Sequence, residues 1–339
     1  MAEGDRVRVG IIGVGGVARN VHLPSLGQID AAEVVAVCDI VGGRAEQVAA
    51  EFGVPAAYAL YTEMLERERL DAAFVLTQPD ALFRPTLDCL RAGKHVFMEK
   101  PPGVTSFQAA ALAREARGAD RILAVGLNRR HIPLVRHVLA LVRERTEITT
   151  VEGRFYKHAS AAFYDGAASA LTIDALHVID AVRWIAGGRP THAAMLEGRL
   201  ADDVPNRWHA VIRFDNGVSG LLRADYMTAA RTHGIEIHGP HASAFVNLGF
   251  GDASCSAEVL LPAGQASSSL AAKGAGNVQR ITLDGRQIAR SDAFHVYYGY
   301  LAEDLDFIDC IREGRRPLAD IDEAVETMRL VDLLLASRI

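Results

Sequence analysis

Short apolar runs and helix-like segments alternate through the first third of the chain. The apolar runs have the length of buried strands and lie at Val7–Ile12, Val34–Cys38, Ala72–Leu76, His95–Met98 and Ile122–Val125. Helix-like segments separate them, for example Gly43–Phe52 and Arg84–Ala92, and Gly93 follows the second as a helix-ending glycine. This alternation is typical of a parallel sheet covered by helices on both faces, so we predict a doubly wound α/β domain over residues 1–126.

A different pattern begins near residue 151. Alternating strand-like runs carry hairpin signals at Asp-Asn-Gly 215–217 and Asp-Gly 284–285, which predict a largely antiparallel sheet. Helices are expected at about Leu171–Ala186, Tyr300–Glu313 and Ile321–Ser337. We therefore predict a second, α+β domain over residues 127–339, whose final helices could pack back on the first. The Ser/Ala/Gly-rich segment Ala263–Gly276 is expected to be a solvated hairpin end in preference to a lid.

Composition and charge exclude several kinds of partner. The 339 residues carry a net charge of −6 with both signs mixed, so the chain lacks the basic footprint of a nucleic-acid-binding protein and a polybasic tail for a membrane surface. No apolar run has the length of a membrane span or follows a signal-peptide pattern, which predicts a cytoplasmic protein. The four cysteines form no C-x-x-C pair, and no cluster has metal-ligand spacing. We predict reduced core cysteines, no metal site and a small-molecule partner.

A glycine-rich turn follows the first apolar run directly, in the sequence Gly-Val-Gly-Gly-Val-Ala at 13–18. Glycine at 13 permits a tight turn, glycine at 15 lets the backbone approach a pyrophosphate, and alanine at 18 keeps the next helix close to its strand. The free N–H groups and the dipole at that helix start favour an anion. The predicted cofactor-binding residues here are Gly13, Gly15, Gly16, Val17 and Ala18.

The second apolar run ends in Asp39, 21 residues beyond Ala18. An acid at about this distance binds the adenosine ribose in dinucleotide-binding units. Its carboxylate would accept hydrogen bonds from both ribose hydroxyls and would repel a 2′-phosphate, so NAD is preferred, while Arg44 close by keeps NADP open. The alternative is an ordinary βαβ unit in which Asp39 is solvated.

The fourth apolar run ends in Glu99 and Lys100, followed by two prolines. Ligands of open α/β sheets bind at the carboxyl edge of the strands. A lysine beside a cationic nicotinamide ring and partly desolvated would have a lowered pKa, which suits proton exchange with a substrate hydroxyl or carbonyl. The alternative is a solvated loop lysine, although the prolines make the loop rigid.

A third candidate group lies in the predicted helix at 171–186. On a continuous helix, Asp174 and His177 share one face, so a carboxylate and an imidazole can form an acid–base pair. His177 suits proton exchange near neutral pH, and Asp174 could orient its ring or contact a substrate hydroxyl. The alternative for His177 is a hydrogen-bonded histidine on a packed helix. Lys157 could line the same pocket, although a surface position at a strand end is equally good.

The chain resembles the glucose–fructose oxidoreductase/inositol dehydrogenase (Gfo/Idh/MocA) family over nearly its whole length. The resemblance rests on Gly13–Ala18, Ala92–Pro101, Asn128–Arg130 and Asp306–Ile308 with Gly314 and Pro317. It implies a Rossmann domain, a C-terminal domain with an open antiparallel sheet often used for oligomer contacts, and NAD(P)-dependent chemistry at a sugar-like or cyclic polyol carbon. Lys100 takes the place of the family's catalytic lysine and Glu99 that of its cofactor-side glutamate.

Two positions depart from the family pattern. The family sets its Asp four residues before the helical His, where this chain has Ile173, so Asp174 stands one place late. At the end of the third apolar run the family has Thr-Pro-Asn and then a His, whereas this chain has no His there. Thr77 and Pro79 are still expected beside a ribose of the cofactor, and Asn128 is a pocket candidate after the fifth run.

These patterns together predict an NAD(P)-dependent dehydrogenase of a sugar-like or inositol-like substrate. Lys100 and His177 are expected to transfer the proton. Two alternatives stay open: an NAD-dependent glycosidase that works through transient oxidation, and a catalytically inactive NAD-sensing regulator. A homodimer or homotetramer is expected from the resemblance.

Overall fold

The computed structural model describes residues 6–163, 168–249, 255–262 and 278–339. The chain forms two compact units, and each is described here by itself. The first combines Met1–His131 with Ala293–Met328, and the second combines Ile132–Asp292 with Arg329–Ile339. These units group residues by contacts in space, and the domain boundary expected at 126/127 stays a prediction. The expected hairpin end Ala263–Gly276 lies outside the described residues.

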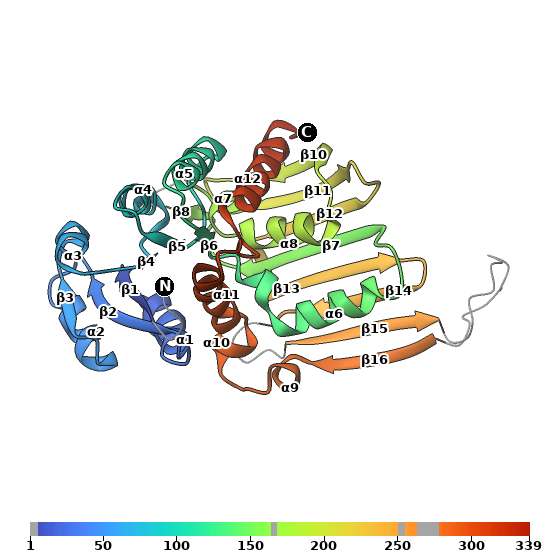
Figure 1. Ribbon diagram of the computed structural model, residues 1–339. Helices are drawn as coiled ribbons and strands as arrows, with labels where there is room; N and C mark the ends of the chain where they lie inside the picture. Colours follow the sequence, from blue (N-terminus) through green and yellow to red (C-terminus); the bar gives the residue numbers. More distant parts are fainter. Residues whose placement is uncertain (1–5, 164–167, 250–254, 263–277) are drawn as a thin grey trace. The chain divides into compact units, whose positions relative to one another are not determined.

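The first unit contains a six-stranded parallel sheet in the order β3-β2-β1-β4-β5-β6 (Figure 1). Its strands are β1 (Val7–Ile12), β2 (Ala32–Cys38), β3 (Ala56–Tyr58), β4 (Ala72–Val75), β5 (His95–Met98) and β6 (Leu123–Val125). The strand order reverses between β1 and β4, and this switch point is where open α/β sheets bind ligands. The doubly wound sheet is confirmed, while the short strand β3 was not predicted.

Helices connect these strands, and further helical segments of this unit come from the far end of the chain. The N-terminal segments are a π-helical turn η1 (Ala18–His22), α1 (Leu23–Leu26), α2 (Arg44–Phe52), α3 (Tyr61–Arg67), η2 (Pro79–Ala81), α4 (Phe83–Arg91), α5 (Ser106–Gly118) and η3 (Asn128–His131). The late segments are α10 (Phe294–Tyr297) and α11 (Tyr300–Glu313), and α12 (Ile321–Ala336) begins in this unit and ends in the second. Helix α11 packs against α1 and β1, so Phe307 joins Phe74 and Phe97 in one buried core (Figure 1).

The second unit contains an eight-stranded sheet in the order β10-β11-β12-β7-β13-β14-β15-β16. Only the β12–β7 pair is parallel, so the largely antiparallel prediction is confirmed. The strands are β7 (Thr150–His158), β10 (Pro190–Gly198), β11 (Arg207–Phe214), β12 (Ser219–Asp225), β13 (Met227–Gly239), β14 (Ala242–Asn247), β15 (Ser256–Pro262) and β16 (Val278–Asp284). A separate pair consists of β8 (Ala162–Phe163) and β9 (Ala168–Ser169).

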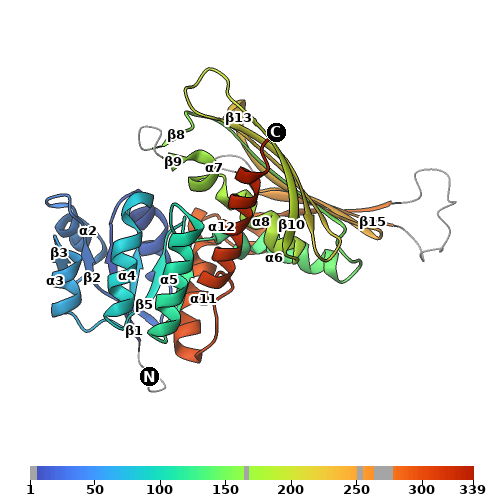
Figure 2. The same cartoon turned by 90° about the horizontal axis from the view of Figure 1, so that it is seen from above.

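Helices α6 (Pro133–Arg143) and α8 (Leu176–Ala186) lie on the same face of this sheet (Figure 2). Helix α8 comes close to β7 because Gly153 has no side chain, and a Cβ there would collide with Val178 and Val182 of the helix. The smaller helices of this unit are α7 (Ala170–Ile173) and α9 (Gly285–Ala289). None of the helices in the described part of the chain is long and apolar enough to cross a membrane.

Two local predictions were wrong for identifiable reasons. Asp284-Gly285 is not a hairpin turn, because the Asp284 carboxylate accepts the Arg286 and Gln287 N–H groups and caps α9. The helix expected over 171–186 is interrupted, since α7 ends at Ile173 and α8 begins at Leu176. The hairpin at 215–217 is confirmed between β11 and β12, and all four cysteines are buried and free of disulfides.

Candidate functional site

The glycine-rich turn leaves β1 at the carboxyl edge of the first sheet. Gly13 has a φ of +88° and donates its N–H to the Cys38 carbonyl at 2.8 Å, while a Cβ at this position would lie 3.0 Å from the Leu76 carbonyl. Only glycine satisfies both constraints. A Cβ on Gly15, in contrast, would meet no atom of the described residues within 4 Å. The turn therefore presents open backbone at Gly15, which fits the close approach of a pyrophosphate.

Asp39 fixes the end of β2 to this turn. Its carboxylate accepts the Val14 N–H at 3.0 Å and the Val41 N–H at 2.9 Å, and the side chain of Arg44 lies 3.4 Å from both oxygens. Asp39 is only 8 % exposed, so the carboxylate is held in a defined orientation beside the turn. Arg44 places a partly exposed positive charge next to it.

Thr77 and Pro79 follow β4 at the same edge. The Thr77 hydroxyl is buried and has no hydrogen-bond partner within the described residues, and its methyl group lies next to Gly13. A buried hydroxyl without a partner costs free energy unless a bound molecule satisfies it. This observation fits a ribose or amide group of a bound dinucleotide. Pro79 begins the short helical turn η2.

Glu99 and Lys100 follow β5 directly, and the Lys100–Pro101 peptide bond is cis. The Glu99 Oε2 atom accepts the backbone N–H of Lys100 at 3.0 Å. A Cβ on the neighbouring Gly126 would lie 3.2 Å from the same oxygen, so the carboxylate packs closely against the backbone there. Burial would raise the pKa of Glu99, but the hydrogen bond and positive charge of His22 hold the pKa below its usual value.

His22 is a functional candidate that the sequence did not reveal. It ends η1 and is fully buried, with Nδ1 at 2.9 Å from one Asp304 oxygen and Nε2 at 3.4 Å from Glu99 Oε1. Burial alone would lower the pKa of His22, but the two carboxylates outweigh it and raise the pKa to about 10. The histidine follows the glycine turn by a few residues, but nothing in its spacing indicates a partner 282 positions further on.

Asn128 lies in η3, after β6, and is buried. Its side-chain N–H donates to the Tyr298 carbonyl at 3.0 Å, and its oxygen accepts from Arg129 at 2.8 Å. The Arg129 guanidinium also lies 4.7 Å from the centre of the Tyr298 ring. Both polar ends of Asn128 are thus used inside the unit, and its binding of a cofactor stays a prediction.

The second unit holds the other predicted proton-transfer residues. His177 lies in the first turn of α8 and is 9 % exposed, while Asp174 caps α7 and precedes α8. Asp174 forms an ion pair with Lys157 and accepts the Tyr226 hydroxyl at 2.9 Å. Burial first, and then the negative charge of Asp174, raise the pKa of Tyr226. Asp174 is therefore oriented by Lys157 of β7 and by Tyr226 between β12 and β13, and the continuous helical face predicted for Asp174 and His177 is wrong.

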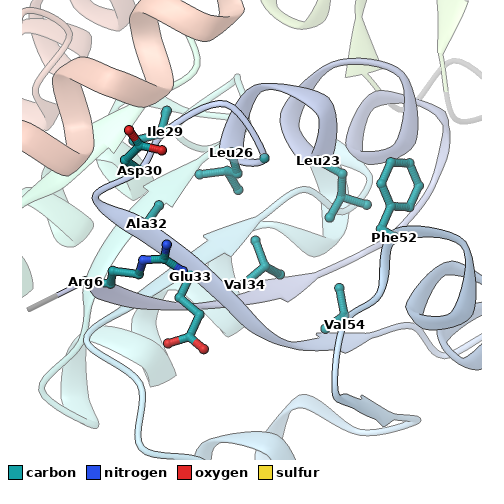
Figure 3. Close-up of a pocket in the computed structure, with 11 residues that line it drawn as sticks. Arg6, Leu23, Leu26, Ile29, Asp30, Ala32, Glu33, Val34, Phe52 and Val54 are labelled. Carbon is teal, nitrogen blue, oxygen red and sulfur yellow. The ribbon is translucent and has the colours of Figure 1, made fainter.

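The first unit also contains a pocket of about 280 Å³ that is distinct from these residues (Figure 3). It is lined among others by Arg6, Ala32, Glu33 and Val34, which lie at the amino ends of β1 and β2. Ligands of open parallel sheets bind at the opposite edge. The pocket therefore takes no part in the site. No group of metal-ligating side chains occurs in the part of the chain that the structure describes.

Comparisons with known proteins match this arrangement. The model of the GFO_IDH_MocA oxidoreductase family, described as an NAD-binding Rossmann fold, matches residues 7–127, and the model of the family's C-terminal alpha/beta domain matches residues 164–338.

Curated relatives match parts of the chain. A myo-inositol 2-dehydrogenase of Thermotoga maritima is 32% identical over 37% of this chain and 37% of its own length. An inositol 2-dehydrogenase/D-chiro-inositol 3-dehydrogenase of Lactiplantibacillus plantarum is 27% identical over 55% of this chain and 54% of its own. A D-glucoside 3-dehydrogenase of Escherichia coli is 34% identical over 37% of this chain and 35% of its own length. The chain thus spans between about a third and half the length of these relatives.

Solved structures match over nearly the whole chain. A dehydrogenase from Chromobacterium violaceum has a TM-score of 0.86 at 24% identity and covers 98% of this chain and 96% of its own. An oxidoreductase from Agrobacterium radiobacter, in complex with NAD+, L-tartaric acid and magnesium, has a TM-score of 0.79 at 18% identity, with 98% and 96% covered. At these identities the likeness shows the fold.

Proposed function

Because the chain belongs to the Gfo/Idh/MocA family of oxidoreductases, whose N-terminal domain is an NAD-binding Rossmann fold, we propose that it is an NAD(P)-dependent dehydrogenase. The proposed substrate is a secondary alcohol or ketone of a sugar, inositol or related cyclic polyol. The observation that carries the proposal is the position of Glu99 and Lys100. They follow β5 at the carboxyl edge of the sheet, which also holds the open Gly15 backbone and the Thr77 hydroxyl, buried without a hydrogen-bond partner in the described part of the chain.

The carboxyl edge of the first sheet would hold the dinucleotide. The proposed binding residues are Gly13, Gly15, Gly16, Val17, Ala18, Asp39, Thr77, Pro79, Glu99, Lys100 and Asn128. The fixed Asp39 carboxylate would accept the ribose hydroxyls and repel a 2′-phosphate, which favours NAD. Arg44 reduces that repulsion and leaves NADP as the weaker cofactor.

The bound nicotinamide supplies the hydride acceptor for the oxidation direction. Lys100 takes the proton of the substrate hydroxyl as the C–H bond of the same carbon breaks, so that alcohol gives ketone and one proton remains on the protein. His177 shares this proton transfer. Asp174, oriented by Lys157 and Tyr226, accepts a hydrogen bond from a substrate hydroxyl and so positions the ring of the substrate.

The experiment is an absorbance screen at the wavelength of the reduced nicotinamide. Purified protein is mixed with NAD or NADP and a panel of aldoses, inositols, sugar acids and glycosides, and released sugar is measured in parallel. We expect reduced NAD with one substrate class, and a turnover about 10²- to 10⁴-fold lower in Lys100→Met with NAD binding largely retained. Near-normal turnover in this variant would refute the role of Lys100.

Two other outcomes would replace the proposal. Release of sugar without net reduced cofactor indicates a glycosidase that works through transient oxidation. Tight NAD binding, measured by calorimetry, without either activity indicates a nucleotide-sensing protein. In the first case the K100M variant should lose sugar release, and in the second it should bind NAD as the wild type does.

The exposed face of the eight-stranded sheet is the proposed contact for a second copy of the chain. On this face Val211 is 55 % exposed and Leu196 is 57 % exposed, and both point away from the covered face of the sheet. Adjacent apolar side chains at this exposure are typical of an interaction surface. We expect a homodimer or homotetramer, and sedimentation of the purified protein tests it.

A further inference from the structure

Four ionisable side chains meet in the interior of the first unit, behind the predicted catalytic strand end. His22 comes from η1, Glu99 from the end of β5, and Asp304 and Glu303 from α11. His22, Asp304 and Glu303 are 0 %, 0 % and 2 % exposed. Such a group is costly to bury unless its charges are paired, so its persistence within the core needs a physical account.

His22 lies between two carboxylates. The two carboxylate oxygens of Asp304 lie 2.9 and 3.1 Å from the Nδ1 atom of His22, within hydrogen-bond distance. On the other side of the ring, Glu99 Oε1 lies 3.4 Å from Nε2. A neutral imidazole carries one N–H and could donate to only one of them. A charged imidazolium donates to both and separates two negative groups that would otherwise repel each other.

The second oxygen of Glu99 has a different partner. Oε2 accepts the backbone N–H of Lys100, so one carboxylate joins the imidazole ring to the peptide of the predicted catalytic lysine. Because both oxygens are engaged, the carboxylate cannot rotate without breaking a contact. The backbone at Lys100 is therefore tied, through Glu99 and His22, to a helix near the other end of the chain.

Aromatic rings fix the imidazole in this position. Phe74, Phe97 and Tyr300 surround His22 with ring centres 5.8, 5.2 and 5.7 Å away, all in edge-on or tilted contact. These contacts enclose the imidazole, which is fully buried, in a close-packed aromatic environment. They also give the ion pairs a low-dielectric environment, where the attraction between charges is strong.

On the premise that Lys100 transfers the proton in the proposed dehydrogenase, we propose that His22, held by Asp304, is a positioning residue that fixes Glu99 and through it the catalytic Lys100. The residue acts through Glu99 and does not touch the substrate. Its charge is what makes the contact effective, because the same ring with only one N–H could not donate to Asp304 and to Glu99 Oε1 at once.

The charged and titratable groups that face His22 come from several elements. Glu99 follows β5, Asp304, Glu303 and Tyr300 lie on α11, and Arg129 on η3 acts on Glu303 and Tyr300. Neither Glu303 oxygen has a hydrogen-bond partner among the described residues, and burial followed by the charges of Asp304 and Glu99 raises its pKa well above the usual value. Glu303 donates no hydrogen bond to His22 and accepts none from it within the described residues, which makes Glu303→Gln a matched control.

The first measurement uses ¹⁵N-histidine NMR of the full chain and needs no substrate. The signal of His22 is assigned by its loss in His22→Gln. At pH 8 we expect both ring nitrogens of His22 to carry a proton in the wild type and in Glu303→Gln. In Asp304→Asn the ring should lose its charge about one to three pH units lower, because the principal opposite charge is gone. A neutral His22 at pH 8 in the wild type would overturn the proposal.

The second measurement is kinetic, with NAD and the panel compound that the wild type oxidises. We expect kcat to fall about 10- to 100-fold in His22→Gln with much smaller changes in KM and in the Kd for NAD, because the reacting groups are misplaced and not removed. In Asp304→Asn the alkaline fall of kcat should move to lower pH with the His22 signal. Glu303→Gln should keep the wild-type pH profile, and thermal melts confirm that each variant is folded.

The outcomes separate the two proposals. A wild-type kcat and pH profile in both His22→Gln and Asp304→Asn would refute the positioning role while the dehydrogenase assignment stands. A wild-type chain that oxidises no panel compound, with His22 charged at pH 8, would refute the proposed function and with it the kinetic role, leaving only a buried ion pair.

Discussion

The two units each place a carboxylate against a cation beside a proposed reacting group, but they do so in different surroundings. In the first unit, the side chains of His22 and Asp304 are 0 % exposed. In the second, the side chains of Lys157 and Asp174 are 15 % and 16 % exposed, and Tyr226 shares the carboxylate. A fully enclosed pair cannot exchange partners with a ligand, whereas a partly exposed pair can. The comparison indicates a fixed support in one unit and a substrate-responsive group in the other.

The largest expected effect is on stability and concerns the enclosed pair. Asp304→Ala should lower the free energy of unfolding by about 3–5 kcal/mol, because it leaves a buried histidine without its principal partner. Asp174→Ala should cost only about 1–2 kcal/mol, since water can reach the groups that it leaves behind. Urea unfolding of both variants measures the difference. Equal losses would show that the two clusters are not distinguished by burial.

The next effect is on activity and concerns the partly exposed pair of Lys157 and Asp174. Asp174→Asn should lower kcat/KM about 10- to 100-fold, since the amide cannot accept from Lys157, Tyr226 and a substrate hydroxyl as a carboxylate does. The free energy of unfolding should change little. Asp203→Asn, an exposed carboxylate of the same unit, is the control. Unchanged kinetics in Asp174→Asn would remove Asp174 from the site and favour an ordinary ion pair.

A smaller effect is a pH dependence of stability that arises from the enclosed pair of His22 and Asp304. The folded-state pKa of His22 is raised to about 10 from 6.5, so its contribution is complete below pH 6.5 and is lost as pH rises toward 10. The wild type should therefore lose up to about 1.4 kcal/mol per pH unit in this range relative to His22→Gln. Unfolding at pH 6.5, 8 and 9.5 measures this. Parallel curves for the two proteins would contradict the charged histidine.

The smallest expected effect on chemistry comes from the exposed sheet face. Val211→Glu should shift sedimentation toward smaller species, because a charge is introduced where a second copy is proposed to pack. Turnover per chain should stay near the wild-type value if each copy contains its own site. Leu200→Glu, at an exposed apolar position outside the strands, is the matched control. An unchanged sedimentation coefficient in Val211→Glu would place the contact elsewhere.

The local sequence pattern was sufficient to predict most strands of the first sheet and the residues that follow them at its carboxyl edge. Strands, glycine turn, Asp39 and the Glu99-Lys100 pair are all set by residues close together in the chain, and the register of a parallel sheet then brings their ends to one edge. The short strand β3 escaped detection because three partly buried residues give no periodicity.

Contacts between distant residues could not be predicted in this way. The His22–Asp304 pair depends on how α11 returns to the first sheet, which no local pattern specifies. At the interruption before α8, Asp174 contacts Lys157 of β7 and Tyr226 between β12 and β13, and the pattern of the helix itself does not specify these distant partners. Asp284 illustrates a further ambiguity, since Asp-Gly serves a hairpin turn and a helix cap equally well.

The return of α11 to the first unit also has a consequence for biosynthesis. The segment that supplies Asp304 and Phe307 is translated 173 residues after His131, the last N-terminal residue of that unit, as the positions 131 and 304 show. At ribosomal speeds of about 5–20 residues per second, this is a delay of roughly 9 to 35 s. During that interval the emerging nucleotide-binding sheet has an unfilled core and an unpaired buried histidine. The nascent chain is therefore expected to be a chaperone client until its last helices leave the ribosome.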